Sequence, residues 1–227
     1  MKKLNNLLVL GCSVSDYTNV ETPWGVSLAK QLNTNYIHEA GAKGSNWRMW
    51  RTAFNLVNSK TISPTDTIII QYTEITRKEI WSPYQKTAQM FRFKGFSKQV
   101  PKTDEYDQGV ILRFKMNAYK DKDLSAVEQS FLEKYESFIS TKFETDYFYM
   151  MHNMFQAFMK DNGFKNLYFL KVGPYGLLES SADLIEFYKN NWINSPNALD
   201  DHVQGDRWHM NQQGHDKLAA LVHKYIK

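Results

Sequence analysis

The chain has 227 residues, of which 42% are hydrophobic and 15% are aromatic, and this composition can build a sizeable core and excludes a largely disordered chain. The net charge of +4 is mild and the basic residues are scattered, so we do not expect a nucleic-acid-binding protein. The single cysteine excludes an internal disulfide. No apolar run reaches the roughly 18 residues that a membrane-spanning helix needs.

The first twelve residues resemble a short lipoprotein signal that ends at Cys12. The uninterrupted apolar run, however, is only Leu7–Leu10, whereas an export signal has an apolar region of about 7–15 residues. We therefore predict that residues 4–11 form a buried first strand of a parallel sheet, and we expect a cytoplasmic protein. Cys12 is expected to be buried and unreactive.

Strands and helices are predicted to alternate along the chain. Residues 66–72 give the clearest strand, because Thr67-Ile68-Ile69-Ile70 is β-branched and apolar. Ser45 or Asn46 can cap the helix that follows the loop 41–46, and Gly163 marks a helix end. The other predicted strands are 36–38 and 166–172, and the predicted helices are 26–32, 47–57, 125–161 with a break near residue 141, and 211–226.

The alternation predicts an α/β fold in one domain, residues 1–227, with a central parallel sheet. Residues 82–123 lack a clear period and are predicted to be an irregular insertion or lid. The aromatic residues of this insertion could line a sugar or acyl pocket, or they could pack against the domain or a second subunit. The sequence leaves both interpretations and the oligomeric state open.

Reactive groups in open α/β sheets gather at the carboxyl ends of the strands. Ser13 directly follows the first strand, the loop 41–46 follows the second, and Thr73 follows the third. Asp206 and His209 lie just before the last helix, on an expected turn or single helical turn.

These residues suggest nucleophilic catalysis. A serine hydroxyl is a weak nucleophile until a base removes its proton, and the imidazole of His209 can be that base. A carboxylate three residues earlier, Asp206, could orient the ring.

Three blocks of the sequence resemble the SGNH/GDSL family of serine hydrolases: Gly11-Cys12-Ser13, Gly44-Ser45-Asn46, and Asp206-x-x-His209-x-Asn211-x-x-Gly214-His215. The resemblance implies a flavodoxin-like three-layer α/β/α sandwich and ester hydrolysis through an acyl-serine, without a cofactor. It implies that Ser13 is the nucleophile and first oxyanion donor, that Gly44 is a second donor, and that Asp206 and His209 complete the triad.

The sequence departs from the family pattern in two places. Cys12 stands where the family usually has Asp, and the third block lacks the Asn that usually donates to the oxyanion. Asn46, Thr73 and Arg77 are the candidates to supply the missing polar or positive group.

We expect a small-molecule or carbohydrate ester as substrate, an acetylated carbohydrate being one candidate, with neither a metal nor a nucleic-acid partner. The alternative is a non-catalytic binding or assembly module on the same fold. Two further ideas are weaker. His209 and His215 could form a metal pair with His202 or Asp206, but zinc sites usually have closer ligand spacing. A phosphate site at residues 41–46 would need a fuller glycine pattern.

Overall fold

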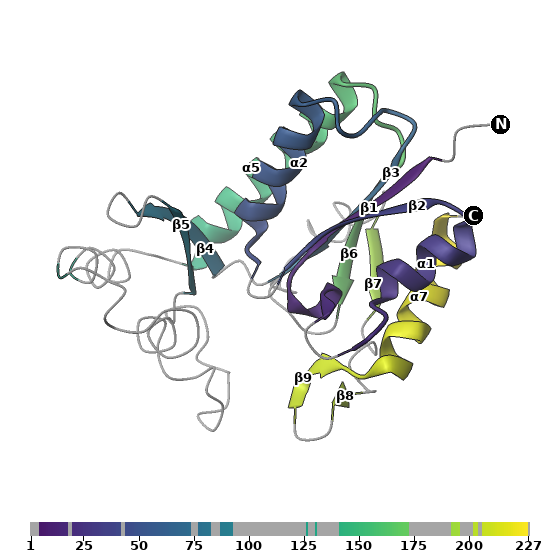
Figure 1. Ribbon diagram of the computed structural model, residues 1–227. Helices are drawn as coiled ribbons and strands as arrows, with labels where there is room; N and C mark the ends of the chain where they lie inside the picture. Colours follow the sequence, from purple (N-terminus) through teal and green to yellow (C-terminus); the bar gives the residue numbers. More distant parts are fainter. Residues whose placement is uncertain are drawn as a thin grey trace.

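A five-stranded parallel sheet lies at the centre of the molecule, with the strand order β2-β1-β3-β6-β7 (Figure 1). The computed structural model describes residues 5–17, 20–41, 44–73, 77–82, 87–92, 126, 130, 141–172, 192–195, 202–203 and 206–226. This order is the flavodoxin-like one, so the predicted α/β fold class is confirmed. The strands are β1 Asn6–Gly11, β2 Asn35–Ala40, β3 Thr67–Tyr72, β6 Leu167–Val172 and β7 Trp192–Ser195.

The middle strands are apolar because both faces of the sheet are covered. Leu7–Leu10 of β1 and Ile68–Ile70 of β3 are fully buried. The apolar N-terminal run is therefore the buried inner strand β1, as predicted. None of the helices in the described part of the chain is both long and apolar enough to cross a membrane.

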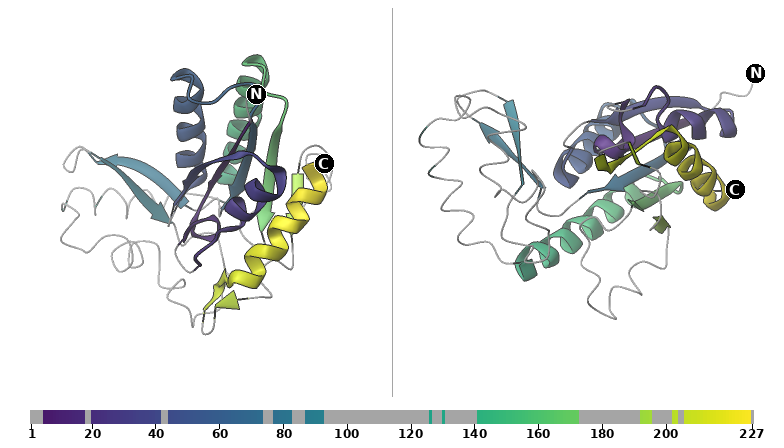
Figure 2. Two further views of the ribbon diagram at one scale, coloured as in Figure 1. Left: turned by 45° about the vertical axis from the view of Figure 1, so that its right-hand side comes forward. Right: turned by 90° about the horizontal axis from the view of Figure 1, so that it is seen from below.

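Two pairs of helices cover the two faces of the sheet (Figures 1 and 2). One pair is α1 Trp24–Leu32 with α7 Gln212–Ile226, and the other is α2 Asn46–Asn58 with α5 Thr141–Asp161. Aromatic rings hold the second pair together, since Phe54 packs against Phe158 in a tilted arrangement with ring centroids 4.7 Å apart. The layers are thus helix, sheet and helix.

The helix ends follow local rules, and two of them, the Ser45 cap and the stop at Gly163, were predicted from the sequence. The Ser45 side chain caps α2 by accepting a hydrogen bond from Arg48 N at 3.1 Å. Gly163 follows α5 with a positive φ of 83°, a left-handed conformation that suits glycine. The Asn211 side chain caps α7 by accepting from Gly214 N at 3.0 Å.

Several expectations were wrong or fall outside the described residues. Residues 87–92 are not irregular: they form β5, Thr87–Arg92, which pairs antiparallel with β4, Arg77–Ser82. Residues 83–86 and 93–123, the rest of the predicted insertion, lie outside the description. So do most of residues 125–140, apart from 126 and 130, which are helical.

Asp206 and His209 do not lie on a turn. They belong to β9, Asp206–Met210, which pairs antiparallel with β8, His202–Val203. Sequence patterns missed this hairpin because its strands are short and carry polar residues.

Candidate active site

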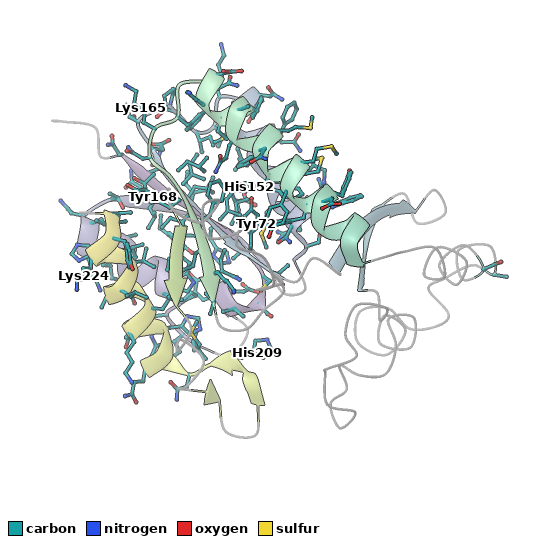
Figure 3. The ribbon with its side chains drawn as sticks, turned by 180° about the vertical axis from the view of Figure 1, so that it is seen from behind. Tyr72, His152, Lys165, Tyr168, His209 and Lys224 are labelled. Carbon is teal, nitrogen blue, oxygen red and sulfur yellow. The ribbon has the colours of Figure 1, made fainter. Side chains whose placement is uncertain are left out.

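Ser13 and His209 meet at the carboxyl end of the sheet. Ser13 opens a short 3-10 turn, Ser13–Ser15, that follows β1 directly, and His209 projects from β9 toward the sheet (Figure 3). Their side chains, 196 residues apart in sequence, come together with His209 Nε2 at 2.9 Å from Ser13 Oγ. Both residues are half-buried. The distance lies within the reach that a general base needs, so this pair can transfer a proton.

Asp206 belongs to the same strand as His209. Its backbone pairs with Val203, while its side chain lies outside the described part of the structure. In a regular strand, residues three apart face opposite sides. Here the pairing advances from Val203 to His202 on β8 but from Asp206 to Met210 on β9, so the register of the two strands shifts. Such an irregularity interrupts the regular alternation of side chains along β9.

The side chain of Gln71 holds the 3-10 turn Ser13–Ser15 in place. Its Oε1 accepts hydrogen bonds from Cys12 N at 3.2 Å, from Cys12 Sγ at 3.3 Å and from Ser15 Oγ at 3.2 Å. Gln71 is fully buried on β3, and Cys12 is 2% exposed, so the prediction that Cys12 is buried is confirmed. One side chain thus fixes the residues on both sides of Ser13.

His215 and Gln212 at the start of α7 form hydrogen bonds to residues at the start of α1. Trp24 N donates to His215 Nδ1 at 3.0 Å, and Gln212 bonds both the N and the O of Thr22, at 3.3 and 2.9 Å. Burial lowers the pKa of His215 to about 4, with a smaller lowering from His209 and an opposing effect of Asp216. Near neutral pH the ring is therefore neutral and its proton sits on Nε2.

The loop after β2 lies against β1. Gly44 N donates to Gly41 O at 3.0 Å, and a Cβ on Gly44 would lie 2.7 Å from Gly11 O. Gly44 is therefore needed for the close approach of this loop to β1. Its N–H would have to share or leave its bond to Gly41 to bind an oxyanion. Ser13 N opens its 3-10 turn and so has no acceptor within that turn.

Asn46 and Thr73 bond to each other. Asn46 Nδ2 donates to Thr73 O at 3.0 Å, and Thr73 N donates to Asn46 Oδ1 at 2.9 Å. Both residues are 2% exposed. The Asn46 amide thus ties the start of α2 to the end of β3. Arg77 begins β4, and its side chain lies outside the described residues.

Three residues that bond to the segments around Ser13 and His209 were missed or undervalued in the sequence: Gln71, Trp24 and His215. Only Gln71 carries a signal of its own, because a glutamine after three isoleucines in a buried strand needs a specific partner. Within the described ranges no group of three His, Cys, Asp or Glu residues could hold an ion, and the side chains of His202 and Asp206 lie outside those ranges.

No family model matches the chain, and no curated protein matches its sequence. The fold and the site define a doubly wound α/β protein with a serine–histidine pair at the carboxyl edge of its sheet.

Proposed function

We propose that this protein is a serine hydrolase of the SGNH type that cleaves a small carboxylic ester. His209 Nε2 takes the proton of Ser13 Oγ while this oxygen attacks the ester carbonyl carbon. The tetrahedral intermediate collapses, and the leaving alkoxide takes the proton from His209. Water, deprotonated by His209, then attacks the acyl-serine, and the acid is released as Ser13 regains its proton.

The observation that carries this proposal is the 2.9 Å contact between Ser13 Oγ and His209 Nε2. The two residues come from opposite ends of the chain, so the contact depends on the whole fold. Ser13 follows a buried strand directly, as a nucleophile at a switch point does. In the proposal Asp206 orients the His209 ring and stabilises the imidazolium that forms.

The proposed oxyanion donors are Ser13 N and Gly44 N, with Asn46, Thr73 and Arg77 as further candidates. The Asn46 amide can contribute only a hydrogen that it does not donate to Thr73. One donor in such a hole contributes about 2.7–4 kcal/mol to lowering the barrier. We therefore expect modest turnover.

The substrate class rests on the family resemblance. We propose a small ester, with acetylated carbohydrates as the first class to assay, and either water or an alcohol as the acyl acceptor.

One observation favours a binding module instead. The amides of Gly44 and Asn46 already have partners within the protein, as expected if the second block serves packing. In that case the serine–histidine pair would be a remnant without turnover.

Steady-state hydrolysis of p-nitrophenyl acetate and of acetylated sugars separates the two functions. We expect turnover by the wild type and a loss of at least about 10³-fold in Ser13→Ala and His209→Gln. Ser59→Ala and His223→Gln, which change residues outside the site, serve as matched controls and should keep wild-type turnover. Equal turnover in wild type and Ser13→Ala would refute the hydrolase proposal.

A further inference from the structure

Trp24 stands between the two segments that bear the proposed catalytic pair. It is the first residue of α1 and is fully buried. Each of its two N–H groups donates to a different part of the chain, and neither part is α1 itself.

The indole N–H reaches the turn that carries the nucleophile. Trp24 Nε1 donates to Ser15 Oγ at 2.8 Å. Ser15 Oγ in turn donates to Gln71 Oε1 at 3.2 Å. Ser15 is fully buried and lies in the same 3-10 turn as Ser13. The Trp24 indole and the Gln71 side chain therefore both hold this turn in place through Ser15.

The backbone N–H reaches the segment that carries the base. Trp24 N donates to His215 Nδ1 at 3.0 Å. His215 lies in the first turn of α7, which begins two residues after the end of β9 and is held there by the Asn211 cap. The position of Trp24 is thereby linked to the strand that presents His209.

We propose that Trp24 is a positioning residue that sets the distance and angle between Ser13 and His209. This inference rests on the proposed hydrolase function. The indole is well suited to the task because it is rigid, is packed on all sides and carries an N–H that can only donate. Trp24 touches no reacting atom and acts through Ser15 and His215.

The variant Trp24→Phe tests this role because it removes the indole N–H and keeps the backbone N–H and most of the ring. We expect kcat and the rate of labelling by a fluorophosphonate probe to fall together by about 10- to 100-fold, as misplacement of a nucleophile does. KM should stay within about twofold, because no substrate contact changes.

Trp50→Phe is the matched control. Trp50 is also buried, and its Nε1 donates to Tyr72 OH at 2.9 Å on the other face of the sheet. The Trp50→Phe variant also loses an indole N–H, at a comparable cost in stability, but it should keep wild-type kcat. An equal fall in kcat in both variants would show that only general stability is at work.

Ser15→Ala provides a second test that leaves the volume at residue 24 unchanged. Its kcat should also fall, and adding Trp24→Phe to Ser15→Ala should lower kcat little further, because the two residues share one bond. Undiminished kcat in Ser15→Ala, or full additivity of the two effects, would overturn the inference. The labelling experiment distinguishes the two proposals. If the wild type is not labelled, both the hydrolase proposal and this inference are overturned. If Trp24→Phe is labelled as fast as the wild type, only this inference is overturned.

Discussion

At the scale of single residues, the oxygen of the Gln71 side chain has the most demanding position. Three donors from Cys12 and Ser15 converge on this one atom in a fully buried site. A buried donor that loses its acceptor pays the full cost of desolvation, which exceeds the net gain from the bond itself. The stability of the 3-10 turn Ser13–Ser15 should therefore depend on the side chain at position 71.

Gln71→Met keeps the length of the side chain and removes its acceptor. We expect a loss of about 1–3 kcal/mol in the free energy of unfolding, measured by urea denaturation, because Cys12 N–H is left without a partner. Gln213→Met makes the same exchange at an exposed position of α7 and should change stability by less than about 0.5 kcal/mol. Equal stability of the two variants would contradict this role of Gln71.

Gly44 offers a second test at this scale. In Gly44→Ala the new Cβ would lie 2.7 Å from the backbone oxygen of Gly11, which cannot swing away. We expect a destabilisation of about 1–3 kcal/mol, as for other overpacked sites. In Gly41→Ala the nearest neighbour is the flexible guanidinium of Arg48, so this control should cost less. A melting temperature of Gly44→Ala at or above that of Gly41→Ala would be incompatible with this packing.

The sequence could predict that Ser13 and His209 are site residues, but it could not predict which residues fix their positions. Ser13 follows a recognisable buried strand, and His209 sits in a motif that is local in sequence. The bond from Ser15 to Gln71 joins residues 56 apart, and the bond from Trp24 to His215 joins residues 191 apart. Such partners depend on the register of the strands and the packing of helices, which no local pattern contains.

At the scale of elements, the contact between α1 and α7 keeps the C-terminal block in place. His215 and Gln212 of α7 bond to Trp24 and Thr22 at the start of α1. Helix starts have unpaired N–H groups, and α1 has no side-chain cap of its own at Pro23. The His215 ring therefore acts as the cap of α1, supplied by another helix.

His215→Leu removes this cap and leaves Trp24 N–H buried without an acceptor. We expect the free energy of unfolding to fall by about 1–3 kcal/mol in chemical denaturation. His223→Leu is the matched control in the same helix. The buried Nε2 of His223 has no partner within the described part of the chain, so its loss should be neutral or slightly stabilising. A larger loss in His223→Leu than in His215→Leu would argue against the cap.

Elements with strong apolar patterns could be predicted, and short polar ones could not. β1, β3 and β6 are mostly apolar, and each lies close to its predicted bounds. β7 has only four residues and β8 only two, too few to show a period. β9 contains Asp206, Arg207 and His209, and such polar residues suggested a turn.

At the scale of the whole molecule, the two faces of the sheet have different polar contents. The face toward α1 carries Gln71 and the 3-10 turn Ser13–Ser15. The face toward α2 and α5 buries a second network, in which Tyr72 OH contacts Trp50 Nε1 at 2.9 Å and His152 Nδ1 at 2.8 Å (Figure 3). The alternation of strands and helices was enough to predict the two faces, but not which polar groups each would bury.

The buried His152 makes stability depend on pH. Burial lowers the pKa of His152 to about 3, from 6.5 for an ordinary histidine. Between about pH 6.5 and 3, the unfolded chain therefore binds a proton at this histidine that the folded chain does not bind. Stability should therefore fall as pH drops from about 6.5 toward 3, by up to about 1.4 kcal/mol per pH unit for this histidine. His215, whose pKa is about 4, adds to the fall over most of this window.

Denaturant unfolding at a series of pH values tests this prediction. His152→Gln should show a shallower loss of stability between about pH 6.5 and 4, because one proton uptake is removed. The His215 contribution should remain in this variant. An unchanged slope would mean that His152 binds its proton as readily in the folded protein as in the unfolded chain, against this prediction.

The central claim is that Ser13 is a nucleophile activated by His209, and covalent labelling tests it most directly. The protein is incubated with a fluorophosphonate, and the modified residue is located by peptide mass spectrometry. We predict a single adduct on Ser13 in the wild type and at least about 10²-fold slower labelling in His209→Gln. An adduct on another residue, no adduct at all, or equally fast labelling in His209→Gln would contradict the claim.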